Sequence, residues 1–204
     1  MAGHYFSEQP DVASAVRRIP LHLPDISIEL DVDRGVFSAD QIDAGTRLLL
    51  LELCKPQTGA VVLDVGCGYG PIACVAALRS PKAQVWAVDV NERARGLCAA
   101  NAERLGLTVS SVGPDDVPDE LRFDLIVSNP PIRIGKKPLH RLLERWLDQL
   151  SPTGHAELVV HKHLGSDSLT RWLNEQGWAT ERVLSRGGYR LLRVQPRIVS
   201  AVST

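Results

Sequence analysis

A short apolar run that ends in three regularly spaced glycines constrains this chain most. Residues 61–70 read VVLDVGCGYG, so Gly66, Gly68 and Gly70 recur at every second position after the apolar run. Pro71 and the apolar residues after it predict a helix, because proline is favoured in the first turn of a helix. A strand, a glycine loop and a helix in succession are typical of a nucleotide-type cofactor site at the carboxyl end of a buried parallel strand.

The remainder of the chain alternates strand and helix patterns. Predicted strands cover residues 61–65, 84–88, 108–112, 123–128 and 156–161, and predicted helices cover 71–79, 91–105, 139–150 and 166–176. A short glycine-containing segment joins residues 178–184 to residues 189–194, which predicts an antiparallel hairpin. We therefore expect an α/β fold, a doubly wound, Rossmann-like sheet of seven mostly parallel strands with an antiparallel last strand.

A small β element is expected before this sheet. Residues 26–32 alternate apolar and polar side chains, which predicts a half-buried strand, and a return strand is expected to start at Val36. Residues 38–55 predict a helix with Asp43 at its N-cap. Residues 1–24 are interpreted as a surface extension with a short helix at 10–17, and 196–204 as a flexible tail. The length of 204 residues fits a single domain over 1–204.

Composition narrows the classes of partner. The net charge is −1, so no global cationic field holds nucleic acid, and any such contact needs a local patch. The four cysteines form no CxxC pair, and no metal site is expected. No apolar run could span a bilayer, and the N-terminus lacks the pattern of a signal peptide. We expect a cytoplasmic protein with no membrane partner.

The glycine spacing separates two candidate cofactors, a dinucleotide and S-adenosylmethionine. The dinucleotide fingerprint G-x-G-x-x-G would place its third glycine at position 71, which is Pro71. The pattern here is G-x-G-x-G, preceded by Asp64. It favours S-adenosylmethionine, which has no pyrophosphate to place at the helix N-terminus.

These residues resemble the class I S-adenosylmethionine-dependent methyltransferases. The resemblance implies that Asp64, Gly66, Gly68 and Gly70 hold the cofactor. It also implies that Asp89, which ends the second strand beside Val90, accepts hydrogen bonds from the ribose diol. An acidic residue after the third strand often meets the adenine in this family. Here either Asp115 or Asp116 could serve, with a solvated acidic turn as the alternative.

The sequence Asn129-Pro130-Pro131 at the end of the fourth strand predicts the chemistry. Two prolines stop both strand and helix, and they fix the backbone so that the Pro130 carbonyl points out of the strand end beside the Asn129 carboxamide. Two acceptors in a rigid fork suit an amino group attached to a planar ring or amide. Catalysis would then consist of positioning and charge stabilisation, with no covalent intermediate.

Asn-Pro-Pro resembles the motif of methyltransferases that act on exocyclic nitrogens of adenine or guanine, or on a glutamine amide. Many carry an aromatic residue next, where this chain has Ile132. Over residues 26–195 the chain resembles guanine-N2 ribosomal RNA methyltransferases of the RsmC type, and it is most similar to the single-domain archaeal-type relatives. Larger bacterial members carry a second, N-terminal copy of the fold. The resemblance implies that Phe37, Asp43 and Thr46 border the methionine end of the cofactor, although a core aromatic and a plain helix cap are equal alternatives.

A local basic patch favours RNA as the acceptor. A base must be unpaired or flipped out to enter such a fork. The segment after Pro131 carries Arg133, Lys136, Lys137, His140, Arg141 and Arg145. We expect Ile132, Arg133, Lys136 and Lys137 to contact ribosomal RNA or the small ribosomal subunit. The alternatives are methylation of a glutamine amide or a small-molecule amine, and a non-catalytic cofactor-binding module that assists a partner.

Overall fold

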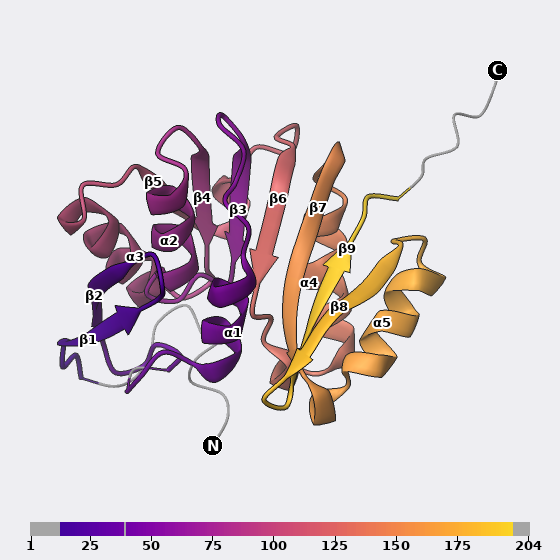
Figure 1. The fold of residues 1–204 in the computed structure, drawn as a ribbon, viewed down its shortest axis with the longest axis horizontal. Helices are drawn as coiled ribbons and strands as arrows, with labels where there is room; N and C mark the ends of the chain where they lie inside the picture. Colours follow the sequence, from indigo (N-terminus) through magenta and orange to yellow (C-terminus); the bar gives the residue numbers. More distant parts are fainter. Residues whose placement is uncertain (1–12, 39, 198–204) are drawn as a thin grey trace.

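The computed structural model describes residues 13–38 and 40–197, and a twisted seven-stranded sheet runs through its centre (Figure 1). The strand order is β5-β4-β3-β6-β7-β9-β8. The strands are β3 (Val61–Val65), β4 (Gln84–Val88), β5 (Val109–Val112), β6 (Phe123–Ser128), β7 (Leu150–His161), β8 (Thr180–Arg186) and β9 (Tyr189–Val194). β9 is antiparallel to both of its neighbours, and the other paired strands are parallel. The predicted fold class is therefore confirmed.

Two hydrophobic clusters cover the two faces of the sheet. Successive strand residues alternate between them, since Val62 belongs to one cluster and Leu63 to the other. The first face packs against α1 (Ala44–Glu52), α2 (Pro71–Arg79), α3 (Glu92–Arg104) and a hairpin of β1 (Arg17–His22) and β2 (Ser27–Val32). The second face packs against α4 (Lys136–Leu147) and α5 (Ser166–Glu175). In the part of the chain that the structure describes, the connections include 3₁₀ turns at Pro114–Asp116, Ile132–Ile134 and Lys162–Leu164, besides irregular loops.

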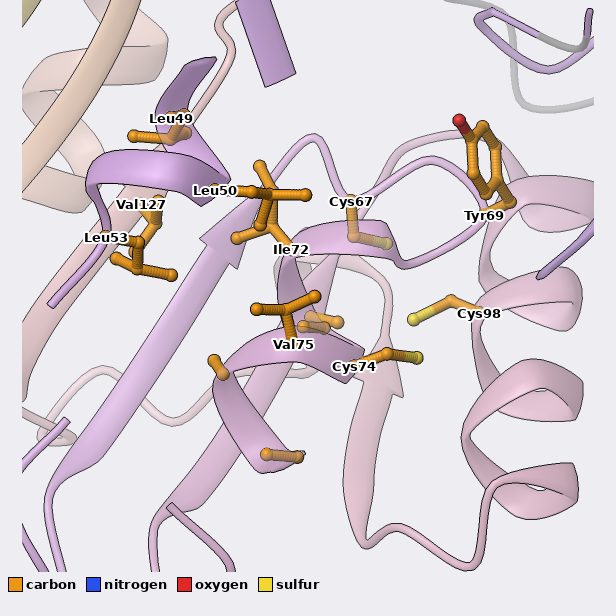
Figure 2. Packing of buried hydrophobic residues seen from close by; sticks show 14 of the residues in the cluster. Leu49, Leu50, Leu53, Cys67, Tyr69, Ile72, Cys74, Val75, Cys98 and Val127 are labelled. Atoms are coloured by element: carbon orange, nitrogen blue, oxygen red, sulfur yellow. The ribbon is translucent and has the colours of Figure 1, made fainter. Parts of the chain in front are cut away.

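The cluster on the first face reaches the glycine loop (Figure 2). Leu50 of α1 and Ile72 of α2 both belong to this cluster, and the two helices are in contact. Cys67, Cys74 and Cys98 are buried, and their side chains point toward one another between α2 and α3. These thiols behave as small apolar core groups, and a hydrogen bond with Cys98 together with burial raises the pKa of the Cys67 thiol.

The N-terminal β element differs from the prediction. β2 pairs with β1, which precedes it, and Val36 and Phe37 lie in a turn with no return strand. Buried Asp33 accepts a hydrogen bond from the Arg34 amide and so holds the chain in that turn. The predicted helix at 10–17 is wrong over its described part, because Arg17 begins β1; residues 10–12 lie outside the described residues. The extension contributes Leu21 to the core, so it is not confined to the surface.

Two of the predicted helices have different bounds in the structure. The helix predicted over 38–55 is shorter, Ala44–Glu52, with Asp43 as its cap. The helix predicted over 139–150 begins at Lys136 and ends at Leu147, and β7 starts at Leu150 rather than Ala156. Gly154 lets this early part of β7 lie close to β6, since a Cβ there would be 2.6 Å from the Phe123 carbonyl oxygen.

Candidate cofactor and acceptor site

The glycine loop after β3 leaves its backbone open at the carboxyl end of the sheet. Gly66, Gly68 and Gly70 all have positive φ, at 74°, 55° and 85°. The Gly66 and Cys67 amides both donate to the carbonyl oxygen of Val88, at 2.8 Å and 3.0 Å, which ties the loop to the end of β4. Gly70 is the N-cap of α2, so the chain turns from loop to helix without a side chain in the way.

Asp64 is fully buried beneath this loop. Its Oδ2 atom accepts a hydrogen bond from the Ala73 amide at 3.0 Å, near the start of α2, while Oδ1 has no partner among the described residues. Burial raises the pKa of Asp64 to about 8, and the nearby charge of Asp89 adds to the shift. The Asp64 carboxyl group therefore joins the end of β3 to the first turn of α2.

Asp89 follows β4 and faces the same loop. Its Oδ2 accepts from the Gly68 amide and its Oδ1 from the Asn91 amide, both at 2.9 Å. The carboxyl group is only partly buried, so its oxygens can also accept the two hydroxyl groups of a ribose. Val90 beside it is 40% exposed. These residues fit the nucleoside end of S-adenosylmethionine.

The turn after β2 covers the other side of the glycine loop. Val36 is buried, and its Cγ1 atom lies 3.9 Å from the position that a Cβ on Gly68 would take. Asn91 caps α3 and donates from Nδ2 to the Gly35 carbonyl oxygen at 3.0 Å, which binds this turn to the start of α3. Phe37 is 49% exposed, so it is not a core residue.

Asn129 meets the N-terminus of α1 directly. Its Nδ2 atom donates to Asp43 Oδ2 at 2.8 Å and to Thr46 Oγ1 at 3.0 Å. The same Asp43 carboxylate accepts the Thr46 amide at 3.0 Å and so caps α1. With both amide hydrogens donated, the Asn129 Oδ1 atom stays available as an acceptor. The structure thus brings together three residues that the sequence proposed separately.

Pro131 shapes the backbone next to that acceptor. It has φ −75° and ψ 74°, and the Ile132 amide donates to the Pro130 carbonyl oxygen at 2.8 Å. These values describe an inverse γ-turn, which points the Pro130 carbonyl in a fixed direction. One lone pair of that oxygen is used by the turn and one remains.

The charge of Asp43 acts on two tyrosines, for which the sequence analysis predicted no role. Burial raises the pKa of Tyr69, in the glycine loop, and the Asp43 charge adds to the shift. Burial and the Asp43 charge also raise the pKa of Tyr189, at the start of β9. Hydrophobic periodicity could not predict this, because both tyrosines lie far from Asp43 in the sequence. The only local signal was Gly45, whose missing side chain makes room for the Tyr189 ring.

Among the described residues, no hydrogen bond joins the acidic turn after β5 to the glycine loop. The Asp115 carboxylate pairs with Arg145 of α4 at 2.9 Å and is highly exposed. Asp116 accepts the Gly113 amide at 3.0 Å. Instead, Arg95 lies close to Gly113 and donates to the carbonyl oxygens of Asp89 and Val90. Both aspartates thus have structural partners, and Asp115 stays a candidate for the adenine only as a prediction.

The basic segment 133–145 contains exposed side chains and one that packs on a neighbouring helix. Arg133, Lys136, Lys137 and Arg141 are exposed. His140 instead stacks on Trp172 of α5, with ring centroids 3.7 Å apart, and burial lowers the pKa of His140. Lys162 and His163 follow the end of β7, beside β6, and add exposed basic groups at the same edge of the sheet. Among the described residues, no group of His, Cys, Asp and Glu is placed to hold a metal ion, and no helix could cross a membrane.

The fold and this arrangement define a class I S-adenosylmethionine-dependent methyltransferase. Residues 27–193 match the family model of the methyltransferase small domain, and the chain belongs to that family. The uncharacterized protein YbxB of Bacillus subtilis is 34% identical over 199 residues, which cover 96% of this chain and 99% of YbxB.

Other relatives are longer than this chain. Ribosomal RNA small subunit methyltransferase C of Shewanella amazonensis is 32% identical over 85% of this chain and 52% of its own length. The protein of the same name from Serratia proteamaculans is 44% identical over 67% of this chain and 41% of its own length. The chain therefore spans about half the length of these methyltransferases.

Solved structures confirm the fold. The T. thermophilus 16S rRNA N2 G1207 methyltransferase (RsmC), in complex with AdoMet and guanosine, superimposes with a TM-score of 0.77 at 24% identity, over 92% of this chain and 52% of that one. A ribosomal protein L11 methylase from Lactobacillus delbrueckii superimposes with a TM-score of 0.61 at 24% identity, over 75% of this chain and 79% of that one. At these identities the likeness concerns the fold.

Proposed function

We propose that this protein transfers the methyl group of S-adenosylmethionine to the exocyclic N2 amino group of a guanine in ribosomal RNA. The observation that carries the proposal is the locked carboxamide of Asn129. Because Asp43 and Thr46 accept both of its hydrogens, its oxygen is presented as an acceptor next to the Pro130 carbonyl. Such a pair of acceptors selects an amine that has two hydrogens to donate.

The two acceptors do the main work of catalysis in this proposal. An amine on a planar ring is a poor nucleophile, because its lone pair is delocalised into the ring. Asn129 Oδ1 and the Pro130 oxygen each take one N–H hydrogen and turn the lone pair out of the ring plane. They also stabilise the positive charge that develops on the nitrogen as it is alkylated.

The cofactor is held by residues on the neighbouring strand ends. Asp89 and the loop of Gly66, Gly68 and Gly70 receive its nucleoside, with Val90 against the base, while Asp64 supports the loop. Phe37, Asp43 and Thr46 border its methionine end. When bound, S-adenosylmethionine supplies an electrophilic methyl group on sulfur. The chain aligns the amine with that methyl group for in-line displacement, and the surplus proton of the methylated amine leaves to water.

The choice of guanine in RNA rests on relatives and on charge. Two long relatives carry the name ribosomal RNA small subunit methyltransferase C. Arg133, Lys136 and Lys137 follow the fork directly and are exposed, where phosphates next to an extruded nucleotide would lie. Ile132, which is partly buried, supplies an apolar contact beside the amine.

Substitution of Asn129 tests the proposal. In Asn129→Ala the fork loses one acceptor, so kcat for methyl transfer to ribosomal RNA should fall about a hundredfold or more. The Kd for S-adenosylmethionine, measured by calorimetry, should change less than about threefold. Asn129→Asp is the matched control of similar shape: it cannot donate to Asp43, so it should be equally inactive. Activity retained in both variants would refute the proposal that Asn129 Oδ1 and the Pro130 carbonyl oxygen bind the acceptor amine.

A further inference from the structure

Tyr189 lies at the same edge of the sheet as the proposed fork. It is the first residue of β9 and pairs in register with His161, the last residue of β7. β7 runs parallel to β6, where Ser128 pairs with Leu158, so Tyr189 sits just beyond the strand end that carries Asn129. The final hairpin therefore brings an aromatic ring to the mouth of the site from the far end of the sequence.

The ring packs against Gly45, which lies in the chain between the two residues that anchor Asn129. A Cβ on Gly45 would lie 2.7 Å from Tyr189 Cε1 and 2.9 Å from Asp43 Oδ2, so the ring and the carboxylate both border Gly45. That carboxylate is the one that holds Asn129. Burial and the charge of Asp43 both raise the pKa of Tyr189.

The orientation of the ring is also fixed. His161 meets it edge to face, with centroids 5.0 Å apart and planes at 84°. The Gly188 carbonyl accepts the Lys162 amide at 2.7 Å, which closes the hairpin against the end of β7. Tyr189 remains only partly buried.

We propose that Tyr189 is a substrate-binding residue that supplies the flat aromatic surface against which the acceptor base rests. A base held only through its amine could still rotate about the C–N bond. Ile132, next to the fork, offers no aromatic face, whereas the Tyr189 ring is rigid and close to the fork. Stacking on an aromatic ring would fix the plane of the base at little entropic cost. This inference rests on the proposed function.

Kinetics of Tyr189 variants test this role. Tyr189→Leu should raise the KM for the RNA about tenfold or more, in line with the loss of one base–aromatic stack. The Kd for S-adenosylmethionine should stay within about twofold, and Tyr189→Phe should restore the wild-type KM. An unchanged KM in Tyr189→Leu, or an equal loss of affinity for S-adenosylmethionine, would overturn the inference in favour of a packing role.

Binding of a fluorescent nucleoside to the wild-type protein gives a second test, which does not depend on whether a variant folds. 2-Aminopurine riboside has an amine at the same position as guanine, and its fluorescence is quenched on stacking. Saturable quenching should occur with wild type and with Tyr189→Phe. If wild type methylates RNA but does not quench the probe, the inference on Tyr189 fails alone. If wild type neither methylates RNA nor binds the probe, the proposed function fails with it.

Discussion

Asn129 shows how a single residue acquires its role from distant partners. The sequence was enough to propose it as an acceptor, because two prolines follow it at a strand end. Its hydrogen bonds to Asp43 and Thr46 span 86 and 83 residues. No local pattern reports such contacts, so the sequence could name all three residues but not the orientation of the carboxamide. Because of that orientation, Asn129 is a candidate catalytic residue and not only part of a turn.

Asp64 should make stability depend on pH. Its folded-state pKa is raised to about 8 by burial, whereas an unfolded aspartate titrates near pH 4. Between these values the unfolded state loses its proton while the folded state keeps it, so stability is fully present below about pH 4 and falls as pH rises to about 8. Asp64→Asn removes this dependence and still accepts the Ala73 amide.

Urea unfolding of both proteins at pH 5.5 and pH 8 measures the effect. The free energy of unfolding of Asp64→Asn minus that of wild type should increase by about 1 kcal/mol or more from the lower to the higher pH. The difference between the two proteins isolates Asp64 from other titrating groups. Parallel pH profiles would mean that Asp64 is ionised in the folded protein.

Among the elements, the glycine loop and α3 offer a matched pair of substitutions. Gly70 has φ +85°, and a Cβ there would lie 2.6 Å from Cys98 Sγ and 3.2 Å from its Cα. Gly70→Ala should therefore destabilise the protein by about 1–3 kcal/mol. Gly96 lies within α3, where a Cβ meets nothing within 4 Å. Gly96→Ala should stabilise it by about 0.5–1 kcal/mol.

Chemical denaturation of both variants gives the two signs directly. Changes of opposite sign in the free energy of unfolding would confirm that the backbone of the glycine loop requires glycine, whereas the helical position does not. Equal effects would show that the loop can shift away from Cys98. The thermal midpoint with S-adenosylmethionine present adds a second readout, since only Gly70 belongs to the cofactor loop.

The bounds of strands and helices that end at turn-forming residues could be predicted from the sequence. The partner of a strand in a sheet could not. Strands β3, β4 and β6 and helix α2 have the predicted bounds, because glycine, proline, asparagine and aspartate mark their ends. The N-terminal hairpin was wrong: β2 was expected to pair with a later segment and pairs with Arg17–His22. An alternating pattern predicts a strand, but it does not choose between neighbours on either side.

At the scale of the whole molecule, we expect RNA to be bound by the positive charges at one edge of the sheet. Lys136 and Lys137 lie at the carboxyl edge beside the fork, whereas Lys55 and Lys82 precede strands at the opposite edge. Replacing Lys136 and Lys137 with glutamine should reduce the slope of log Kd for RNA against log salt by about 1–2, as two phosphate contacts are lost. The same change at Lys55 and Lys82 should leave the slope unaltered.

Fluorescence anisotropy with a labelled RNA over a range of potassium chloride concentrations provides these slopes. Equal slopes for the two double variants would place the RNA elsewhere on the surface. The sequence located the basic segment, but it did not separate exposed Lys136 from His140, which stacks on Trp172, or from Arg145, which pairs with Asp115. Those contacts join elements that are distant in the chain and depend on the packing of α4.

The most direct test of the central claim is to follow the methyl group. Purified protein, S-adenosylmethionine with a tritiated methyl group and unmodified ribosomal RNA, free and in small subunits, would be incubated and the RNA digested to nucleosides. The account predicts label in N2-methylguanosine with wild type and none with Asn129→Ala. Label in a protein glutamine or in another nucleoside, with none in N2-methylguanosine, would contradict it.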